Sequence, residues 1–278
     1  MIEKIILLKK WIEKYLIYIR GKNIRKKQDS SNFALIIVSG HRVGSTWIFN
    51  VLADLGIFYP AVLPVQYRQQ SKGFRFINLQ ADGALNYLSQ RSEYRIYKSH
   101  SLPPIENTTG IKYLAVFRDL RDAAVSNAYY VANLSPELGG WMEMESMTIP
   151  ERIKYYLRRS EYDINLTSHW FALSDAVKVF YEQMQKDTVG TVQSVLNELG
   201  LSIPVHIVEQ AIKRNSFVRM AKGRKPGQTN GQSFYRKGII GDWKNYFDQD
   251  LIECFKTAQN GRWNSLLVKM GYERDIDW

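Results

Sequence analysis

The 278-residue sequence has one cysteine, Cys254, and no apolar run that approaches the roughly 20 residues needed to cross a bilayer. A single thiol cannot form an internal disulfide, so there is no disulfide framework and a cytoplasmic location is favoured. Clusters of histidine and cysteine with zinc-ligand spacing are also lacking, and no metal site is expected. The sequence has 27 acidic residues against 38 lysines and arginines, and the resulting net charge of +11 favours anionic partners.

Apolar residues make up 45% of the chain and charged residues 23%, which is typical of a folded globular protein. Apolar runs rich in β-branched and aromatic residues predict buried parallel strands at residues 34–38, 95–97, 111–117 and 176–181. Helical patterns follow at residues 45–55, 119–130 and 188–199. This alternation predicts a single α/β domain with a central parallel sheet flanked by helices. Ligands of such domains bind at the carboxyl ends of the strands.

The N-terminal segment is expected to be a basic amphipathic helix and linker over residues 1–32, before a domain over residues 33–278. Apolar residues recur in it at helical spacing, but Lys9 and Lys10 interrupt the stretch that a secretory leader would need. Two interpretations remain open. The helix lies on an anionic membrane surface through residues 1–27, or it docks on the domain or on a partner.

A candidate phosphate loop follows the first predicted strand, over residues 39–47. A strand, a glycine-bearing turn and a helix that starts with Ser45 and Thr46 offer unpaired backbone N–H groups to an anion. The loop is not a Walker A motif, because Gly40 to Gly44 is one residue short and Ser45 occupies the lysine position. The turn by itself is compatible with phosphate binding and with a purely structural role.

The same loop resembles the 5′-phosphosulfate loop of the sulfotransferases that use PAPS (3′-phosphoadenosine 5′-phosphosulfate), usually written PKSGTTW. Gly44, Ser45, Thr46 and Trp47 stand in register with GTTW, and His41 to Val43 replace Pro, Lys and Ser. Further segments resemble this family in its order: Lys98-Ser99-His100 with Leu102-Pro103 (KTHLP), Phe117 to Ser126 (the 3′-phosphate motif), residues 180–184 (FYEDM), Asn215-Ser216-Phe217 with Met220 (the adenine segment) and residues 236–244 (RKGxxGDWK).

The resemblance, closest to the cytosolic branch, implies a P-loop-like nucleotide-binding architecture, PAPS as donor with PAP (the desulfated donor) as product, and no metal. It implies that His100 is the catalytic base and that Arg42 and Lys98 are catalytic cations. It assigns Arg118, Ser126, Arg236, Lys237 and Gly238 to the 3′-phosphate. The remaining expected nucleotide-binding residues are Arg42, Val43, Gly44, Ser45, Thr46, Trp47, Tyr181, Asn215 and Phe217, of which Trp47 and Phe217 would sandwich the adenine.

Two positions depart from the family pattern. Arg42 replaces the lysine that steadies the bridging oxygen, and arginine has a planar fork where lysine has a compact ammonium group. An extra residue, Ser101, separates His100 from Leu102. By contrast, Arg121 is expected to be a solvated charge on the helix that follows Arg118.

The acceptor is expected to be a small molecule, a lipid or a carbohydrate, and not nucleic acid. The acceptor pocket is expected to be formed by residues 59–76 and 134–149, where Tyr67, Phe74 and Trp141 offer aromatic surfaces. Two alternatives remain beside the transferase. A P-loop-like nucleotide-dependent kinase would require ATP and magnesium, and a non-catalytic basic surface would bind polyanions but leave the ordered motifs unexplained.

Overall fold

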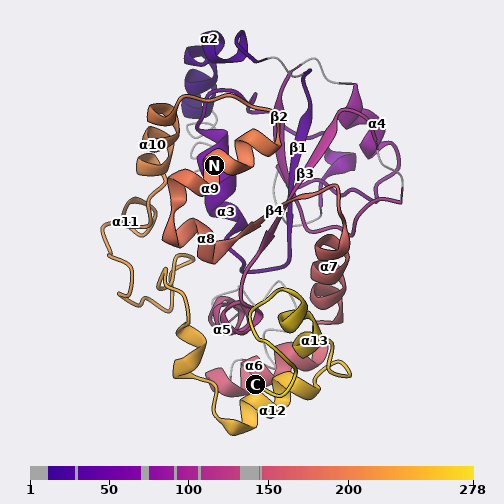
Figure 1. Ribbon diagram of the computed structural model, residues 1–278, viewed down its shortest axis with the longest axis vertical. Coiled ribbons are helices and arrows are strands. Elements are labelled where there is room, and N and C mark those ends of the chain that lie inside the picture. Colours follow the sequence, from indigo (N-terminus) through magenta and orange to yellow (C-terminus); the bar gives the residue numbers. More distant parts are fainter. Residues whose placement is uncertain are drawn as a thin grey trace.

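The computed structural model describes residues 12–28, 31–69, 75–90, 93–105, 108–131, 144 and 146–278. Within these residues the centre of the molecule is a parallel four-stranded sheet in the order β2-β1-β3-β4 (Figure 1). The strands are β1 (Ala34–Ser39), β2 (Arg95–Ser99), β3 (Ile111–Phe117) and β4 (Val177–Phe180). Parallel strands are covered on both faces, which is why they read as nearly continuous apolar runs in the sequence.

The register brings the carboxyl ends of the strands to one edge of the sheet. Val38 pairs with Ser99 and Ser39 pairs with Val116, while Phe117 pairs with Phe180. The residues that leave this edge are therefore neighbours although they are far apart in the sequence. The candidate functional residues lie in the segments that directly follow these strand ends.

Helices cover both faces of the sheet, and alternate residues of β1 point to each (Figure 1). The helices on the Leu35 and Ile37 face are α3 (Ser45–Ala53), α8 (Tyr181–Lys186), α9 (Thr188–Glu198) and α10 (Val205–Arg214). Those that contribute to the core of the other face are α4 (Ala84–Ser89), α5 (Leu120–Val131), α6 (Ile149–Arg159), α7 (Glu161–Ala172), α12 (Gln249–Thr257) and α13 (Arg262–Lys269). The short elements are α2 (Lys22–Arg25), η1 (Val65–Tyr67), α11 (Phe217–Met220) and η3 (Asp242–Asn245).

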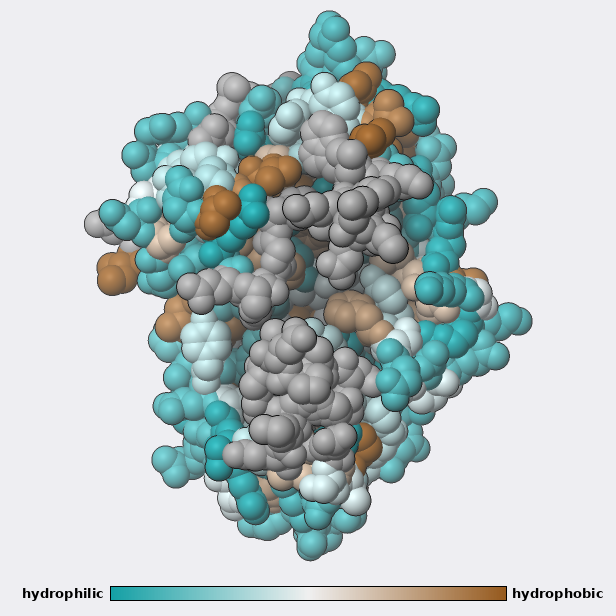
Figure 2. All heavy atoms as spheres, turned by 180° about the vertical axis from the view of Figure 1, so that it is seen from behind, coloured by the Kyte–Doolittle hydropathy of each residue, from teal (hydrophilic) through white to brown (hydrophobic). Residues whose placement is uncertain are grey.

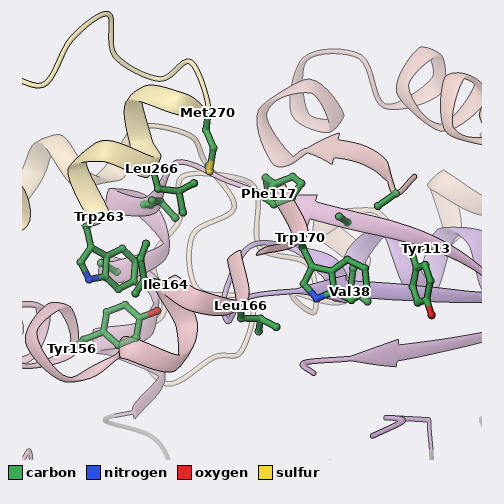
Figure 3. Packing of buried hydrophobic residues seen from close by; sticks show 14 of the residues in the cluster. Val38, Tyr113, Phe117, Tyr156, Ile164, Leu166, Trp170, Trp263, Leu266 and Met270 are labelled. Atoms are coloured by element: carbon green, nitrogen blue, oxygen red, sulfur yellow. The ribbon is translucent and has the colours of Figure 1, made fainter. Parts of the chain in front are cut away.

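Two buried tryptophans organise the core on the face of α6 and α7 (Figure 3). The Trp170 ring lies 5.0 Å from that of Tyr113 on β3, and the Trp263 ring lies 5.5 Å from that of Tyr156 on α6. Each indole donates to a backbone carbonyl, at 2.8 and 2.9 Å, so neither buried N–H is left unpaired. Hydrophilic side chains cover much of the opposite view of the surface (Figure 2).

The predicted α/β architecture with a central parallel sheet is confirmed, and the boundaries differ only locally. The last strand ends at Phe180, because Tyr181 already begins α8. The strand predicted over residues 95–97 continues to Ser99, because β1 pairs with it along its whole length.

The N-terminal segment packs against the domain over the part that the structure describes. Residues 12–20 are helical. Tyr18 meets the Tyr59 ring edge-on at 5.2 Å, Lys14 forms an ion pair with the buried Asp54, and Arg25 donates to the carbonyl of Gly56 at 2.7 Å. These contacts favour the docked interpretation for residues 12–28. No helix in the described ranges is long and apolar enough to span a membrane.

The docked segment makes a testable prediction at Gly21, where a β-carbon would overlap the carbonyl oxygen of Gly56. Gly21→Ala should lower the free energy of unfolding by about 1–3 kcal/mol, because backbone on one side of the contact must move. Trypsin should then cut sooner after Lys22. Urea unfolding and timed proteolysis check this, with Asn23→Ala on the exposed side as the matched control. Equal proteolysis of the two variants would show that the close approach is not needed.

Candidate functional site

The loop after β1 forms the floor of the site. Gly44 caps the N-terminus of α3 with φ of 90°, a left-handed conformation that glycine adopts without strain. Ser39 Oγ donates to Ser45 Oγ at 3.0 Å, which joins the end of the strand to the first turn of the helix. Backbone N–H groups at the start of a helix, together with the helix dipole, favour an anion at this position.

A cavity of about 310 Å³ opens above this loop. The predicted nucleotide-binding residues that line it are Arg42, Gly44, Ser45, Thr46, Trp47, Arg118, Ser126, Tyr181, Asn215, Phe217, Arg236, Lys237 and Gly238. Val43 is the exception, because its side chain is buried in the core on the Leu35 face. Residues from five separate motifs therefore meet in one cavity. Gln185 also lines it and donates to Tyr181 Oη at 2.7 Å, a contact that no motif indicated.

Three buried donors in this cavity fit a polyanionic nucleotide. Trp47 Nε1, Arg118 Nε and Arg236 Nη1 are buried and have no hydrogen-bond partner among the described residues. Buried donors are normally paired, so these atoms indicate that a ligand supplies the acceptors. Phosphate oxygens are suitable acceptors for the two guanidinium groups.

Buried carboxylates orient the arginines of the cavity. Arg118 donates to Asp122 at 3.3 Å and to the carbonyl of Ile239 at 3.0 Å. Arg236 and Lys237 both bond Asp242. Burial opposes the charge on Asp242, but the hydrogen bonds from Lys237 and Arg236 hold its pKa below the ordinary value. Asp242 therefore acts as a fixed anion, and the ion pairs of both carboxylates hold cations at the cavity wall.

Part of the cavity wall is apolar and aromatic. Trp47 and Tyr181 meet edge-on with ring centroids 6.0 Å apart. Phe217 lines the same space and packs against Gly238, so closely that a β-carbon there would overlap the ring. Such a wall suits a flat heterocycle, whereas the arginines suit phosphate. Asn215 is fixed by its bond to Asp54 Oδ2 at 2.7 Å.

His100 lies at the end of β2, outside the set of residues that line the nucleotide cavity. Its Nδ1 is 2.7 Å from the carbonyl oxygen of Ser39. A carbonyl only accepts, so Nδ1 carries the proton and the lone pair of the neutral ring is on Nε2. Lys98 lies two residues earlier, on β2. It donates to Thr46 Oγ1 at 2.8 Å and so connects β2 to the phosphate loop.

The surroundings of His100 include residues that sequence reasoning missed. The His41 ring stacks on His100 at 4.7 Å, and Asp163 on α7 holds His41 Nδ1 at 2.6 Å. Tyr162 donates to the carbonyl of His100 at 2.6 Å. His41 was visible only as a replacement for the family's proline, and no sequence signal linked α7 to the loop.

Arg42 reaches away from the floor of the loop toward α5. Its Nε lies 3.2 Å from Ser126 Oγ, and its guanidinium packs against the rings of Tyr130 and Phe234 at 4.5 and 4.4 Å. Burial, with a smaller effect of the nearby Arg118 and Arg236, lowers the pKa of Arg42 to about 10. The group thus stays cationic at neutral pH.

The expectation that Arg121 is a solvated charge is wrong. Arg121 is 3% exposed and bonds Asp119 at 2.8 Å and Glu273 at 2.6 Å. Its guanidinium also lies over the ring of Trp243 at 3.8 Å. The C-terminal segment covers this side of α5, and the sequence around Arg121 contains no sign of that distant contact.

The acceptor segments are described only in part. Residues 70–74, 132–143 and 145, which include Phe74 and Trp141, lie outside the described residues. In the described part, Tyr67 packs on Tyr87 at 4.9 Å, and Phe76 stacks on His100 at 5.5 Å. An aromatic surface therefore adjoins the histidine.

Comparisons with known proteins agree with this geometry. Residues 34–263 match the family described as the sulfotransferase domain. Sulfotransferase 1E1 of Cavia porcellus is 29% identical over 245 residues, covering 80% of each chain, and sulfotransferase 6B1 of Homo sapiens is 26% identical over 253 residues, covering 86% of this chain and 80% of its own.

Solved structures share the fold. Mouse sulfotransferase SULT7A1 complexed with PAP superposes with a TM-score of 0.59 at 18% identity, covering 89% of this chain and 90% of its own. Retinol dehydratase in complex with androsterone and PAP superposes with a TM-score of 0.57 at 17% identity, covering 91% of this chain and 85% of its own. The kinase alternative is not favoured by these findings. The family match covers most of the chain, and the protein belongs to the sulfotransferase domain family.

Proposed function

We propose that the protein is a PAPS-dependent sulfotransferase that transfers a sulfuryl group to a hydroxyl or amine of a small-molecule, lipid or carbohydrate acceptor. The observation that carries the proposal is a cavity with three buried donors that have no partner among the described residues. A histidine of defined tautomer lies at the next strand end. The structure of a fold relative, mouse SULT7A1, contains PAP, which supports the same donor here.

In this proposal the cavity binds the nucleotide at two ends. Arg118, Ser126, Arg236 and Lys237 hold the 3′-phosphate, and charge-assisted bonds from the arginines provide most of the affinity. Trp47 and Phe217 hold the adenine. The first turn of α3 holds the 5′ group through its backbone N–H groups. Residues 33–278 would be the catalytic domain, with residues 12–28 packed on it.

The donor supplies the sulfuryl group, and the protein positions an in-line attack. His100 Nε2 takes the proton from the acceptor hydroxyl as its oxygen bonds to sulfur. Lys98 lies on the same strand end, bonded to Thr46, and stabilises the negative charge that develops on the departing phosphate oxygen. No metal ligand takes part in this proposal.

The acceptor would enter beside Phe76 and His100, and the androsterone in the retinol dehydratase structure supports a hydrophobic small molecule. We place the protein in the cytoplasm, where the single buried thiol, Cys254, stays reduced. Peripheral membrane contact is included in the proposal, because Ile12, Leu16 and Ile19 are 44 to 50% exposed on one helical face.

Membrane contact predicts co-sedimentation of the full chain with vesicles that contain anionic lipid. Replacing Ile12, Leu16 and Ile19 together by serine should release the protein, because about 25 cal/mol per Å² of apolar surface would no longer be buried. The exposed Val205→Ser variant on α10 is the control. Equal sedimentation of the triple variant and the wild type would refute the contact.

Donor binding is tested by calorimetric titration of PAP in the presence of EDTA. Wild-type protein should bind, and Arg118→Ala should bind about 10- to 100-fold more weakly, the loss expected for hydrogen bonds between charged groups. ATP with magnesium is titrated in parallel. Binding of ATP and magnesium without binding of PAP would remove the sulfotransferase proposal.

The base is tested with [³⁵S]PAPS and a panel of acceptors that comprises a phenol, a sterol, a primary alcohol and a sugar. His100→Ala should lower the rate of transfer by about 10²- to 10⁴-fold, the usual contribution of a general base. PAP affinity should be retained, because His100 lies outside the nucleotide cavity. His206→Ala, at an exposed position on α10, is the matched control. An unchanged rate in His100→Ala would assign the base to another residue.

A further inference from the structure

Arg42 occupies an aromatic slot at the edge of the nucleotide cavity. One wall is Tyr130, from the last turn of α5, and the other is Phe234, from the loop before residue 236. Stacking on two rings holds a planar guanidinium in one orientation. The residue also has φ of 64°, a conformation that side-chain-bearing residues rarely adopt, which sets the direction in which the side chain leaves the loop.

The hydrogen bonds of Arg42 fix it beside a predicted phosphate ligand. Nε donates to Ser126 Oγ at 3.2 Å and Nη2 donates to the carbonyl of Phe234 at 2.9 Å. These bonds use two of the five guanidinium N–H groups. The others have no hydrogen-bond partner among the described residues and are available to an anion.

The charges around Arg42 also indicate an anion. Arg118 is paired with Asp122, and Arg236 with Asp242. In the part of the chain that the structure describes, no carboxylate pairs with Arg42, although Arg118 and Arg236 are close enough to depress its pKa. Asp242 is shared by Arg236 and Lys237, so the cations here outnumber the two carboxylates. The positive charge of Arg42 is left uncompensated, and it lies beside Ser126.

We propose that Arg42 is a ligand of the nucleotide 3′-phosphate, placed there by the Tyr130–Phe234 slot, and that it distinguishes nucleotides with a 3′-phosphate from those without one. This inference rests on the proposed function. A cavity of about 190 Å³ lined by Arg42, Ser126, Tyr130, Phe234 and Arg236 adjoins the main one at this point. The catalytic cation beside the departing oxygen is then Lys98, and the arginine of the phosphosulfate loop serves recognition.

The experiment is calorimetric titration of three nucleotides into the full chain: PAP, adenosine 3′-monophosphate and adenosine 5′-monophosphate. Arg42→Ala should weaken the first two by about 10- to 100-fold, the loss of charge-assisted bonds to one phosphate, and should change 5′-monophosphate affinity by less than about threefold. Arg42→Lys, which keeps the charge but not the fork, should show the same selectivity with a smaller loss.

The controls separate this inference from general electrostatics and from the donor assignment. Arg219→Ala on α11 removes the same charge at an exposed position near the cavity and should leave all three affinities nearly unchanged. In Arg42→Ala, a loss for PAP and adenosine 5′-monophosphate without a loss for adenosine 3′-monophosphate would place Arg42 at the 5′ group. An equal loss for all three nucleotides would give Arg42 only a general electrostatic or structural role. Either result would overturn the inference while leaving the donor site intact. Unchanged affinities would also overturn it. Failure of wild-type protein to bind PAP would overturn the proposed function itself.

Discussion

The donor cavity depends on the carboxylate of Asp122, which is fully buried on α5. It accepts from Arg118 and from the backbone N–H groups of Gly241 and Trp243, the last two at 2.8 Å. A buried charge is stable only when its partners are in place. This one carboxylate therefore fixes the end of β3, at Arg118, relative to the distant loop at Gly241 and Trp243. Asp242 does the same for Arg236 and Lys237. The phosphate end is therefore shaped before any ligand arrives, which reduces the ordering that binding requires.

A third buried carboxylate, Asp54, connects the N-terminal segment to the adenine end of the cavity. It forms an ion pair with Lys14 of the N-terminal helical segment and accepts a hydrogen bond from Asn215 at the end of α10. Asn215 directly precedes the segment that contains Phe217. The packing of the N-terminal segment and the position of the adenine wall therefore both depend on the Asp54 carboxylate. The segment contributes to the domain as well as presenting an exposed apolar face.

Much of this arrangement was predictable because it depends on local chemistry. The strands were recognisable because burial on both faces demands continuous apolar runs, and their carboxyl ends carry the motifs because parallel strands end at one edge. Glycine at position 44 and hydroxyls at 45 and 46 indicated an anion site for the same local reason. Arg118 and Ser126 were predicted from the family resemblance, and both line the cavity.

The sequence by itself determined the sheet and a candidate phosphate loop, since these follow from periodicity and turn chemistry. Its resemblance to the sulfotransferases implied which residues would form the nucleotide site. Only the tertiary structure decided where long side chains end. Arg121 is buried by the C-terminal segment, His41 is held by Asp163 from α7, and Arg42 turns into a slot made by Tyr130 and Phe234. Each of these contacts joins residues brought together by packing, and a flexible cation takes its position from the anions and rings that packing places around it.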